Sequence, residues 1–187
     1  MKIPGVRFAQ PLLPAQRAAI SSSAPAFTLV ELLVVIGLLA VLAGLLLPVL
    51  SRARAEGYRT ACKSNLAQLT KAVQMYAGEH QSRYPYVAAR PSLAPGLARL
   101  CDTLAPYAPD PKVLRCPADR QGFYELEGSS YEWNAALNGR QQDGFLEQFV
   151  GASKTPMLYD YENFHPNPGP GSFGGKNVAF CDGSVGN

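Results

Sequence analysis

The sequence lacks the short motifs that identify many enzymes. It contains no Gly-Lys-Ser/Thr phosphate loop, no Gly-x-Ser-x-Gly nucleophile elbow and no His-Glu-x-x-His metal motif. Histidine is limited to His80, at the end of a predicted helix, and His165, in a Pro-rich loop. Solvated loop positions are the better interpretation for both. We therefore predict no catalytic residues and no enzymatic activity.

Metal-binding patterns are also missing. The four cysteines contain no Cys-x-x-Cys pair and no zinc-ligand spacing. Asp160, Glu162, Asn163 and Asp182 carry oxygen atoms of the kind that Ca²⁺ prefers, but their spacing matches no calcium loop. A charged rim on a loop explains them better. We predict no cofactor, with Ca²⁺ as the less favoured alternative.

The chain has no excess charge once its first 26 residues are set aside. It has 17 basic and 14 acidic residues, and the excess corresponds to Lys2, Arg7 and Arg17, in a segment without acids. Residues 64–187 have 10 basic and 12 acidic side chains. A nucleic-acid partner is therefore not expected. Internal repeats and low-complexity tracts are also absent from the sequence.

The sequence does have a 24-residue apolar run, from Phe27 to Leu50. As a helix it would span roughly 36 Å at ~1.5 Å per residue, enough to cross a bilayer. The run contains one carboxylate, Glu31, and no basic residue. A carboxylate in hydrocarbon costs at least ~2.5 kcal/mol, so Glu31 needs a specific partner. A free α-amino group, created by cutting the bond before Phe27, would supply one.

The residues from Ala26 to Glu31, Ala-Phe-Thr-Leu-Val-Glu, resemble the cleavage signal of type IV prepilins and type II secretion pseudopilins. The resemblance is close over residues 27–31 and extends through the apolar run. It implies a leader, residues 1–26, that is removed between Ala26, where the family usually has Gly, and Phe27. It also implies N-methylation of Phe27 and pairing of Glu31 with an amine of a neighbouring subunit.

The resemblance implies partners and a location as well. The partners are a prepilin peptidase/N-methyltransferase, other pilin-like subunits, an inner-membrane assembly platform and membrane lipid. Basic residues flank both ends of the apolar run, so charge alone does not set the orientation. The resemblance predicts a single-pass inner-membrane protein with a periplasmic head, assembled into a filament. The alternative is a plain signal anchor carrying a binding or enzymatic domain that does not polymerise.

Pro48 and Gly44 form a predicted soft point near the end of the transmembrane segment, residues 27–50. Pro48 has no N–H to donate to the Gly44 carbonyl, and its ring presses on that carbonyl. Glycine lets the backbone bend there. The two interpretations are a flexible point used in assembly and a kink that serves packing alone. Gly37, Ala40 and Gly44 also form a small-residue face suited to close helix packing.

The helix is predicted to continue over residues 51–80 as an amphipathic segment. Apolar residues recur there at intervals of three and four, namely Tyr58, Cys62, Leu66, Leu69, Val73 and Tyr76. Residues 81–187 are long enough to form a globular head with one modest core. We predict an α+β, pilin-like fold, in which the long N-terminal helix packs on a small, mainly antiparallel sheet with large loops.

Short elements are predicted within the head. Helices are expected over residues 91–106 and 143–150. Turn residues separate five short β signals, over residues 113–116, 123–126, 130–133, 157–161 and 177–181.

The segment from Gly174 to Val185 resembles the terminal processing-associated motif that accompanies prepilin-type signals. That motif has a His ten residues before its Asp-Gly pair, a position that is Ser172 in this chain, whereas His165 lies seven residues earlier. Asp182 and Gly183 predict a tight hairpin turn between two short strands. The alternative for this pair is a specific binding role.

The four cysteines leave disulfides and buried free thiols as open alternatives. Cys62 and Cys116 occupy places where sequences of the resembling family carry cysteine. The resemblance therefore implies a Cys62–Cys116 disulfide, with Cys101 and Cys181 as a possible second pair.

Overall fold

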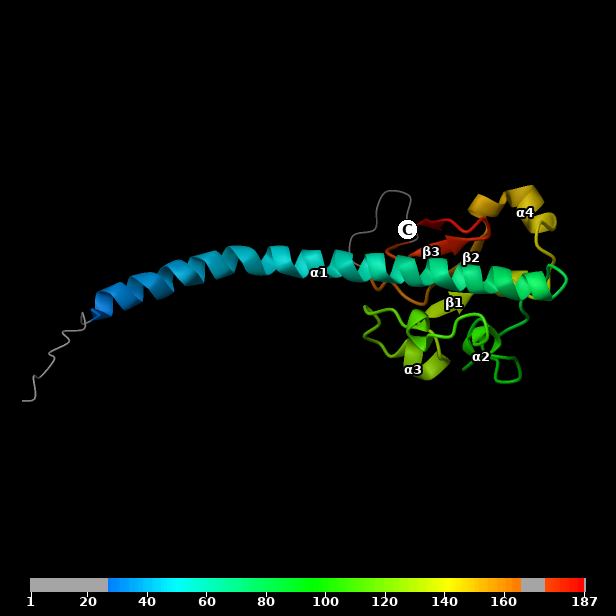
Figure 1. The fold of residues 1–187 in the computed structure, drawn as a ribbon, viewed down its shortest axis with the longest axis horizontal. Helices are drawn as coiled ribbons and strands as arrows, with labels where there is room; N and C mark the ends of the chain where they lie inside the picture. Colours follow the sequence, from blue (N-terminus) through cyan, green and yellow to red (C-terminus); the bar gives the residue numbers. More distant parts are fainter. Residues whose placement is uncertain (1–26, 166–173, 187) are drawn as a thin grey trace, which may run out of the picture. The chain divides into compact units, whose positions relative to one another are not determined.

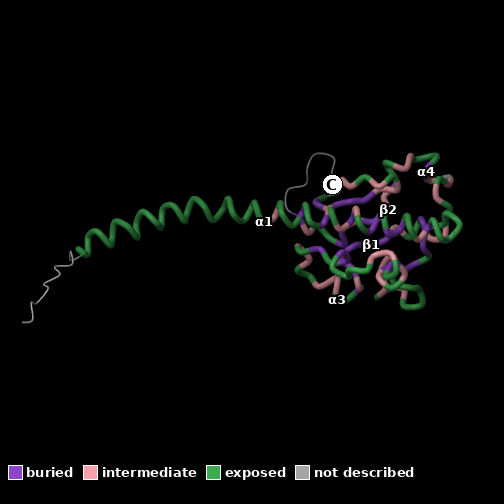
Figure 2. Tube along the Cα trace, viewed as in Figure 1, coloured by how far each residue is buried: buried purple, intermediate pink, exposed green. Residues whose placement is uncertain are grey.

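A single long helix, α1 (Leu29–Glu79), opens the part of the chain that the computed structural model describes, residues 27–165 and 174–186. It has 51 residues, and its length and composition would allow it to cross a membrane. Every residue from Phe27 to Arg54 is exposed, so the described chain leaves these apolar side chains uncovered (Figure 2). The helix predicted from residue 27 to about residue 80 is confirmed.

The described residues fall into two compact units, which divide between Ala43 and Gly44. The second unit contains the rest of α1 and all of the short elements that follow it in the chain (Figure 1). The buried core and the clusters described below belong to this second unit.

The head is built on a four-stranded antiparallel sheet. Its strands lie side by side in chain order: β1 (Tyr131–Trp133), β2 (Pro156–Asp160), β3 (Val178–Phe180) and β4 (Val185–Gly186). Glu132 lies opposite Tyr159, which lies opposite Val178. The fold is therefore α+β, with one long N-terminal apolar helix and a small antiparallel sheet, as predicted. The strands predicted over residues 130–133, 157–161 and 177–181 are confirmed.

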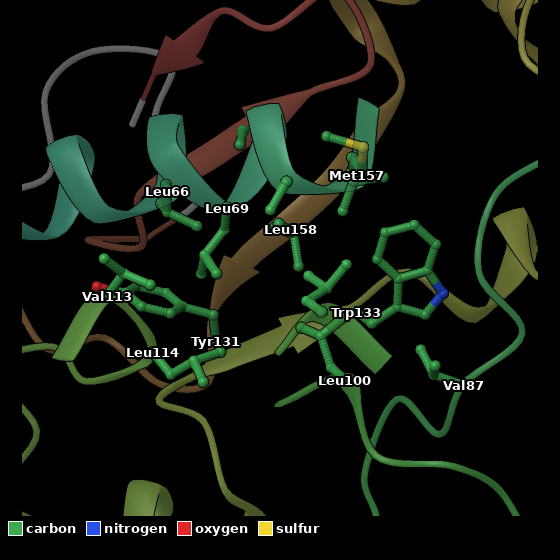
Figure 3. Packing of buried hydrophobic residues seen from close by; sticks show 14 of the residues in the cluster. Leu66, Leu69, Val87, Leu100, Val113, Leu114, Tyr131, Trp133, Met157 and Leu158 are labelled. Atoms are coloured by element: carbon green, nitrogen blue, oxygen red, sulfur yellow. The ribbon is translucent and has the colours of Figure 1, made fainter. Parts of the chain in front are cut away.

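The core lies between α1 and the sheet (Figure 3). Leu66 and Leu69 of α1 are fully buried and belong to one hydrophobic cluster with Trp133 and Leu158 of the sheet. Each fully buried leucine stabilises the fold by roughly 1.5–3 kcal/mol, so this face of α1 holds the head together. The apolar stripe is shorter than predicted. Its buried part begins at Cys62, because Tyr58 is 38% exposed.

Two of the predicted strands are helices instead. Residues 113–116 overlap η1 (Pro111–Leu114), a 3₁₀ helix, and residues 123–126 lie in α3 (Phe123–Glu127). The Asp110 side chain accepts a hydrogen bond from Lys112 N at 3.0 Å, and the Asp119 carboxylate accepts one from Tyr124 N at 3.0 Å. Such caps satisfy N–H groups that a helix start leaves free. They outweigh the β propensity of these apolar and aromatic segments.

The remaining helices are short. They are α2 (Leu100–Leu104), η2 (Ala135–Leu137), α4 (Phe145–Val150) and η3 (Ala152–Lys154). The helix predicted over residues 143–150 is confirmed, whereas only the end of the one predicted over residues 91–106 is helical. Pro95 and Gly96 interrupt that segment, and Leu93 before them is 78% exposed, while Leu100 after them is buried.

Candidate functional site

Glu31 lies in the first turn of α1, and Thr28 stands just before the helix. The N–H and the hydroxyl of Thr28 both donate to Glu31 Oε2, at 2.9 and 2.6 Å. Glu31 N in turn donates to Thr28 Oγ1 at 3.2 Å. This reciprocal arrangement is a capping box, which satisfies two N–H groups at the start of the helix.

Thr28 is a partner of Glu31 that was not predicted, because a cation was expected there. The Thr-Leu-Val-Glu order is itself a capping-box signal, so the sequence contained the information. Among the ion pairs of the described residues, none involves Glu31. Phe27 is 74% exposed, and Ala26 lies outside the described residues. The cap therefore gives Glu31 hydrogen bonds, and the described residues supply no counter-ion for its charge.

The predicted soft point is helical in the structure. α1 runs through Pro48 without interruption, and Ser51 Oγ donates to Pro48 O at 2.9 Å. Apart from the glycine itself, its chain neighbours and the adjacent backbone of α1, no described atom lies within 4 Å of where a Cβ would stand at Gly37 or Gly44. This open space would accept close approach of another helix. Flexibility at Gly44 and Pro48 stays a prediction.

Cys62 and Cys116 form a disulfide that ties α1 to the segment after η1. Both residues are fully buried. They are separated by 54 positions in the sequence, and the chain-entropy model gives a loop of that length a stabilisation of about 4 kcal/mol. This is the pair that the family resemblance implied.

His165 lies beside the disulfide, where it is only 2% exposed. Its Nε2 is 3.7 Å from Cys116 Sγ and 3.4 Å from Asp160 Oδ2. Burial lowers the pKa of His165 to about 4, so the imidazole is neutral at neutral pH and its contact with Asp160 is not an ion pair. The predicted solvated position is wrong for His165, because the fold packs its ring against Cys116 and Asp160. His80 is exposed, as predicted.

Asp160, at the end of β2, completes this cluster. It is fully buried, and its Oδ2 accepts hydrogen bonds from Asn177 N at 2.7 Å and Asn177 Nδ2 at 3.0 Å. Burial raises the pKa of Asp160 to about 7. Asp160 is therefore not part of the predicted charged rim, although Glu162 and Asn163 are exposed. Asn177 was missed, and its only signal was its place in the motif at residues 174–185.

Several polar atoms of the buried cluster could bind a ligand. Asp160 Oδ1, His165 Nδ1 and Asn177 Oδ1 are buried without a hydrogen-bond partner among the described residues. A buried polar group left unpaired costs about 1–3 kcal/mol. Cys62, Cys116 and His165 are also the one group of possible metal ligands that the described part of the chain brings together.

Asp182 and Gly183 form a hairpin turn between β3 and β4, as predicted. Asp182 Oδ1 accepts a hydrogen bond from Ser184 N at 2.9 Å, and Gly183 N donates to Phe180 O at 3.0 Å. Gly183 has φ +89°, in the left-handed region that favours glycine. The Asp182 carboxylate is thus used within the turn, and Ser172 lies outside the described residues.

Cys101 and Cys181 are free thiols, so the second disulfide considered from the sequence is not formed. Burial raises the pKa of Cys181 to about 12, and burial likewise raises the pKa of Cys101. Both side chains are therefore protonated at neutral pH. A protonated thiol is a poor nucleophile, which does not favour a reactive-cysteine role for either residue.

A groove of about 590 Å³ opens beside the cluster. Leu50 and Arg54 of α1 line it, together with Arg120 and Phe164 from two loops, and His165 forms part of its wall. The described residues that line the groove include no carboxylate and no cysteine. The potentially reactive side chains that line the groove beside His165 are those of Ser51, Tyr58 and two arginines.

Comparisons with known proteins yield no relative. No protein-family model, no curated protein and no solved structure matches the chain.

Proposed function

We propose that this chain is a structural subunit of the pilin-like or pseudopilin type, which assembles through α1 into a type II secretion or type IV pilus-like filament. In this proposal α1 anchors the chain as a single pass in the inner membrane, with the head in the periplasm. A prepilin peptidase cuts between Ala26 and Phe27 and methylates Phe27. The remaining partners are other pilin-like subunits, an inner-membrane assembly platform and membrane lipid.

Glu31 carries this proposal. It is the one charged residue in the apolar run from Phe27 to Leu50, and it is exposed on α1. A cleaved neighbour would bring its Phe27 amine to this carboxylate. Carboxylate and ammonium at close range in a low dielectric offset each other's desolvation. A misplaced subunit would leave both charges unpaired, so the pair would set the register of assembly.

The fold supports the proposal in a more general way. Apolar side chains from Phe27 to Leu50 are exposed, and a surface of this kind needs lipid or other helices to cover it. The small antiparallel sheet packed on the second half of α1 is compatible with a pilin-like head.

Intact mass of the protein isolated from membranes tests the processing step. We expect loss of residues 1–26 and the addition of one methyl group to Phe27. Ala26→Gly should be cut in the same way, whereas Ala26→Leu should leave the chain uncut because the site requires a small residue. A wild-type chain that keeps its first 26 residues in the mature membrane would contradict the proposal.

A membrane-anchored domain that does not polymerise is the second candidate, and the capping box favours it. Thr28 already gives the Glu31 carboxylate hydrogen-bond partners without a neighbouring subunit. Disulfide crosslinking in membranes separates the two candidates, with Cys101 and Cys181 first replaced by Ser. Each chain then has one free thiol, so a filament predicts crosslinked dimers for Ala40→Cys, on the small-residue face. It predicts far fewer dimers for Leu42→Cys, on the opposite side of the helix. An absence of dimers for both variants would favour the anchored domain.

A further inference from the structure

Four side chains that can ligate a metal converge inside the head. Cys62 comes from α1, Cys116 follows η1, Asp160 ends β2 and His165 lies five residues later, and none is more than 2% exposed. The ligand atoms of Cys62, Cys116 and His165 all lie within 4.8 Å of one another. His165 Nε2 faces both Cys116 Sγ, at 3.7 Å, and Asp160 Oδ2, at 3.4 Å. A single ring nitrogen thus points at a sulfur atom and at a carboxylate.

We propose that the head binds one Zn²⁺ at this place when the Cys62–Cys116 disulfide is reduced. The ligands are the two thiolates, His165 Nε2 and the Asp160 carboxylate. Sulfur, nitrogen and oxygen ligands in tetrahedral geometry are what Zn²⁺ takes in proteins. With bonds of ~2.0–2.3 Å, neighbouring ligand atoms lie roughly 3.3–3.8 Å apart. The distances from His165 Nε2 to Cys116 Sγ and to Asp160 Oδ2 fall in this range.

The surroundings of the cluster fit a cation. Asp160 Oδ1 is buried and accepts no hydrogen bond from the described residues. A buried carboxylate oxygen without a donor needs a partner, and Zn²⁺ would supply one in addition to the positive charges of Lys176 and Arg59 nearby. His165 also lines the groove beside the cluster, so the proposed site lies next to a hollow that opens to solvent.

The redox step and the binding step are separate. A dithiol reductant donates two electrons and two protons to the Cys62–Cys116 bond, becomes a disulfide itself, and leaves two thiols. Zn²⁺ then displaces both thiol protons, and the proton that Asp160 carries in its protonated form, to solvent, because the ligands are thiolates and a carboxylate, and it binds the neutral imidazole of His165. Disulfide and metal are mutually exclusive, since they use the same two sulfur atoms.

The proposed site therefore gives α1 and the segment after η1 two alternative links. The disulfide joins them under oxidising conditions, and the metal joins them under reducing conditions. This inference does not depend on whether the chain polymerises.

Cobalt binding to the full chain in detergent micelles tests the site, in a Cys101→Ser, Cys181→Ser background that removes the other thiols. The chain is unfolded with a dithiol, freed of reductant, and refolded without oxygen in the presence of Co²⁺. We expect one Co²⁺ per chain, with thiolate-to-cobalt charge-transfer absorption that Zn²⁺ bleaches. The oxidised chain should show no such absorption. His165→Ala should weaken the affinity at least ~10-fold, while the exposed control His80→Ala should not.

X-ray absorption of the zinc-loaded chain gives a second readout that needs no ligand variant. Two sulfur ligands and two nitrogen or oxygen ligands are expected. The near-ultraviolet circular dichroism of buried Trp133 reports whether each refolded chain is native. A natively refolded, reduced chain that binds no metal would overturn the proposal. So would a zinc shell without sulfur, or an affinity unchanged in a native His165→Ala chain.

Discussion

Thr28 and Glu31 hold each other at the first turn of α1, through two hydrogen bonds that end on Glu31 Oε2 and one that ends on Thr28 Oγ1. The Glu31 side chain therefore has two properties that can be tested separately. Its oxygen accepts the hydrogen bonds of the cap, and its carboxylate carries a charge. Glutamine at this position keeps the acceptor and loses the charge. Alanine at position 28 removes the cap and keeps the charge.

Glu31→Gln should be cleaved but should not enter filaments, because the neighbour's terminal amine would lack its counter-ion. Thr28→Ala should still assemble, with the helix start weakened by about 0.5–2 kcal/mol. Immunoblotting of sheared filaments against whole membranes measures both. If Glu31→Gln assembled normally and Thr28→Ala did not, Glu31 would be a helix cap without a role in subunit register.

Replacing Cys62 and Cys116 together by Ser should lower the free energy of unfolding of the head by about 2–5 kcal/mol, because the loop between them is no longer closed. Denaturant unfolding of the detergent-solubilised chain, followed by the fluorescence of Trp133, measures this. The matched control is the Cys101→Ser, Cys181→Ser pair, which removes two free thiols. An equal loss in both double variants would mean that the bond itself contributes little.

Leu69→Ala should destabilise the head by about 2–5 kcal/mol, because it opens a cavity between α1 and the sheet. Leu69 is fully buried, whereas Leu93 is 78% exposed. Leu93→Ala should therefore change the free energy of unfolding by less than about 0.5 kcal/mol. If the unfolding free energy of both variants depends equally on denaturant concentration, the difference between their denaturant midpoints gives the difference in stability. Similar losses of stability in Leu69→Ala and Leu93→Ala would show that α1 does not supply the core.

Asp119 should make the head sensitive to acid. Burial alone would raise the pKa of its carboxyl, but hydrogen bonds from Ser130 and from backbone N–H groups, Tyr124 first among them, lower the pKa overall. The stability gained from these bonds is present above the unfolded pKa of about 3.9. It is lost as the pH falls through the lowered folded value.

The expected result is that stability falls less steeply below about pH 4 in Asp119→Asn than in the wild type, because the variant has no proton to bind at this position. Denaturant midpoints measured at a series of pH values give the two profiles. The matched control is Asp143→Asn, which makes the same change at an exposed site. Identical profiles for wild type and Asp119→Asn would contradict the assignment.

Features that repeat along the chain were predictable. The apolar run from Phe27 and the apolar stripe that includes Leu66 and Leu69 each extend over several helical turns. A few residues that depart from the pattern therefore do not hide the helix or its buried face. Short elements were harder, because single caps such as Asp110 and Asp119 decide between helix and strand.

The family resemblance implied the Cys62–Cys116 pair, but the place of His165 beside it could not be predicted, for a different reason. His165 lies far from both cysteines in the sequence, and only the packed fold brings the three together. A histidine followed by prolines looks solvated when it is judged from its neighbours in sequence. Burial of His165 depends instead on α1 and on the end of β2, which no local pattern reveals.

The Cys62–Cys116 bond also has a mechanical consequence. When α1 is pulled and the head resists, the force passes directly from Cys62 to Cys116 through the covalent bond. Residues 63–115 lie inside the closed loop and cannot be drawn out while the bond is intact. At about 3.3–3.6 Å per extended residue, roughly 180 Å of chain is shielded from the load. One molecule can therefore extend less far under load when Cys62 and Cys116 are bonded than when they are reduced.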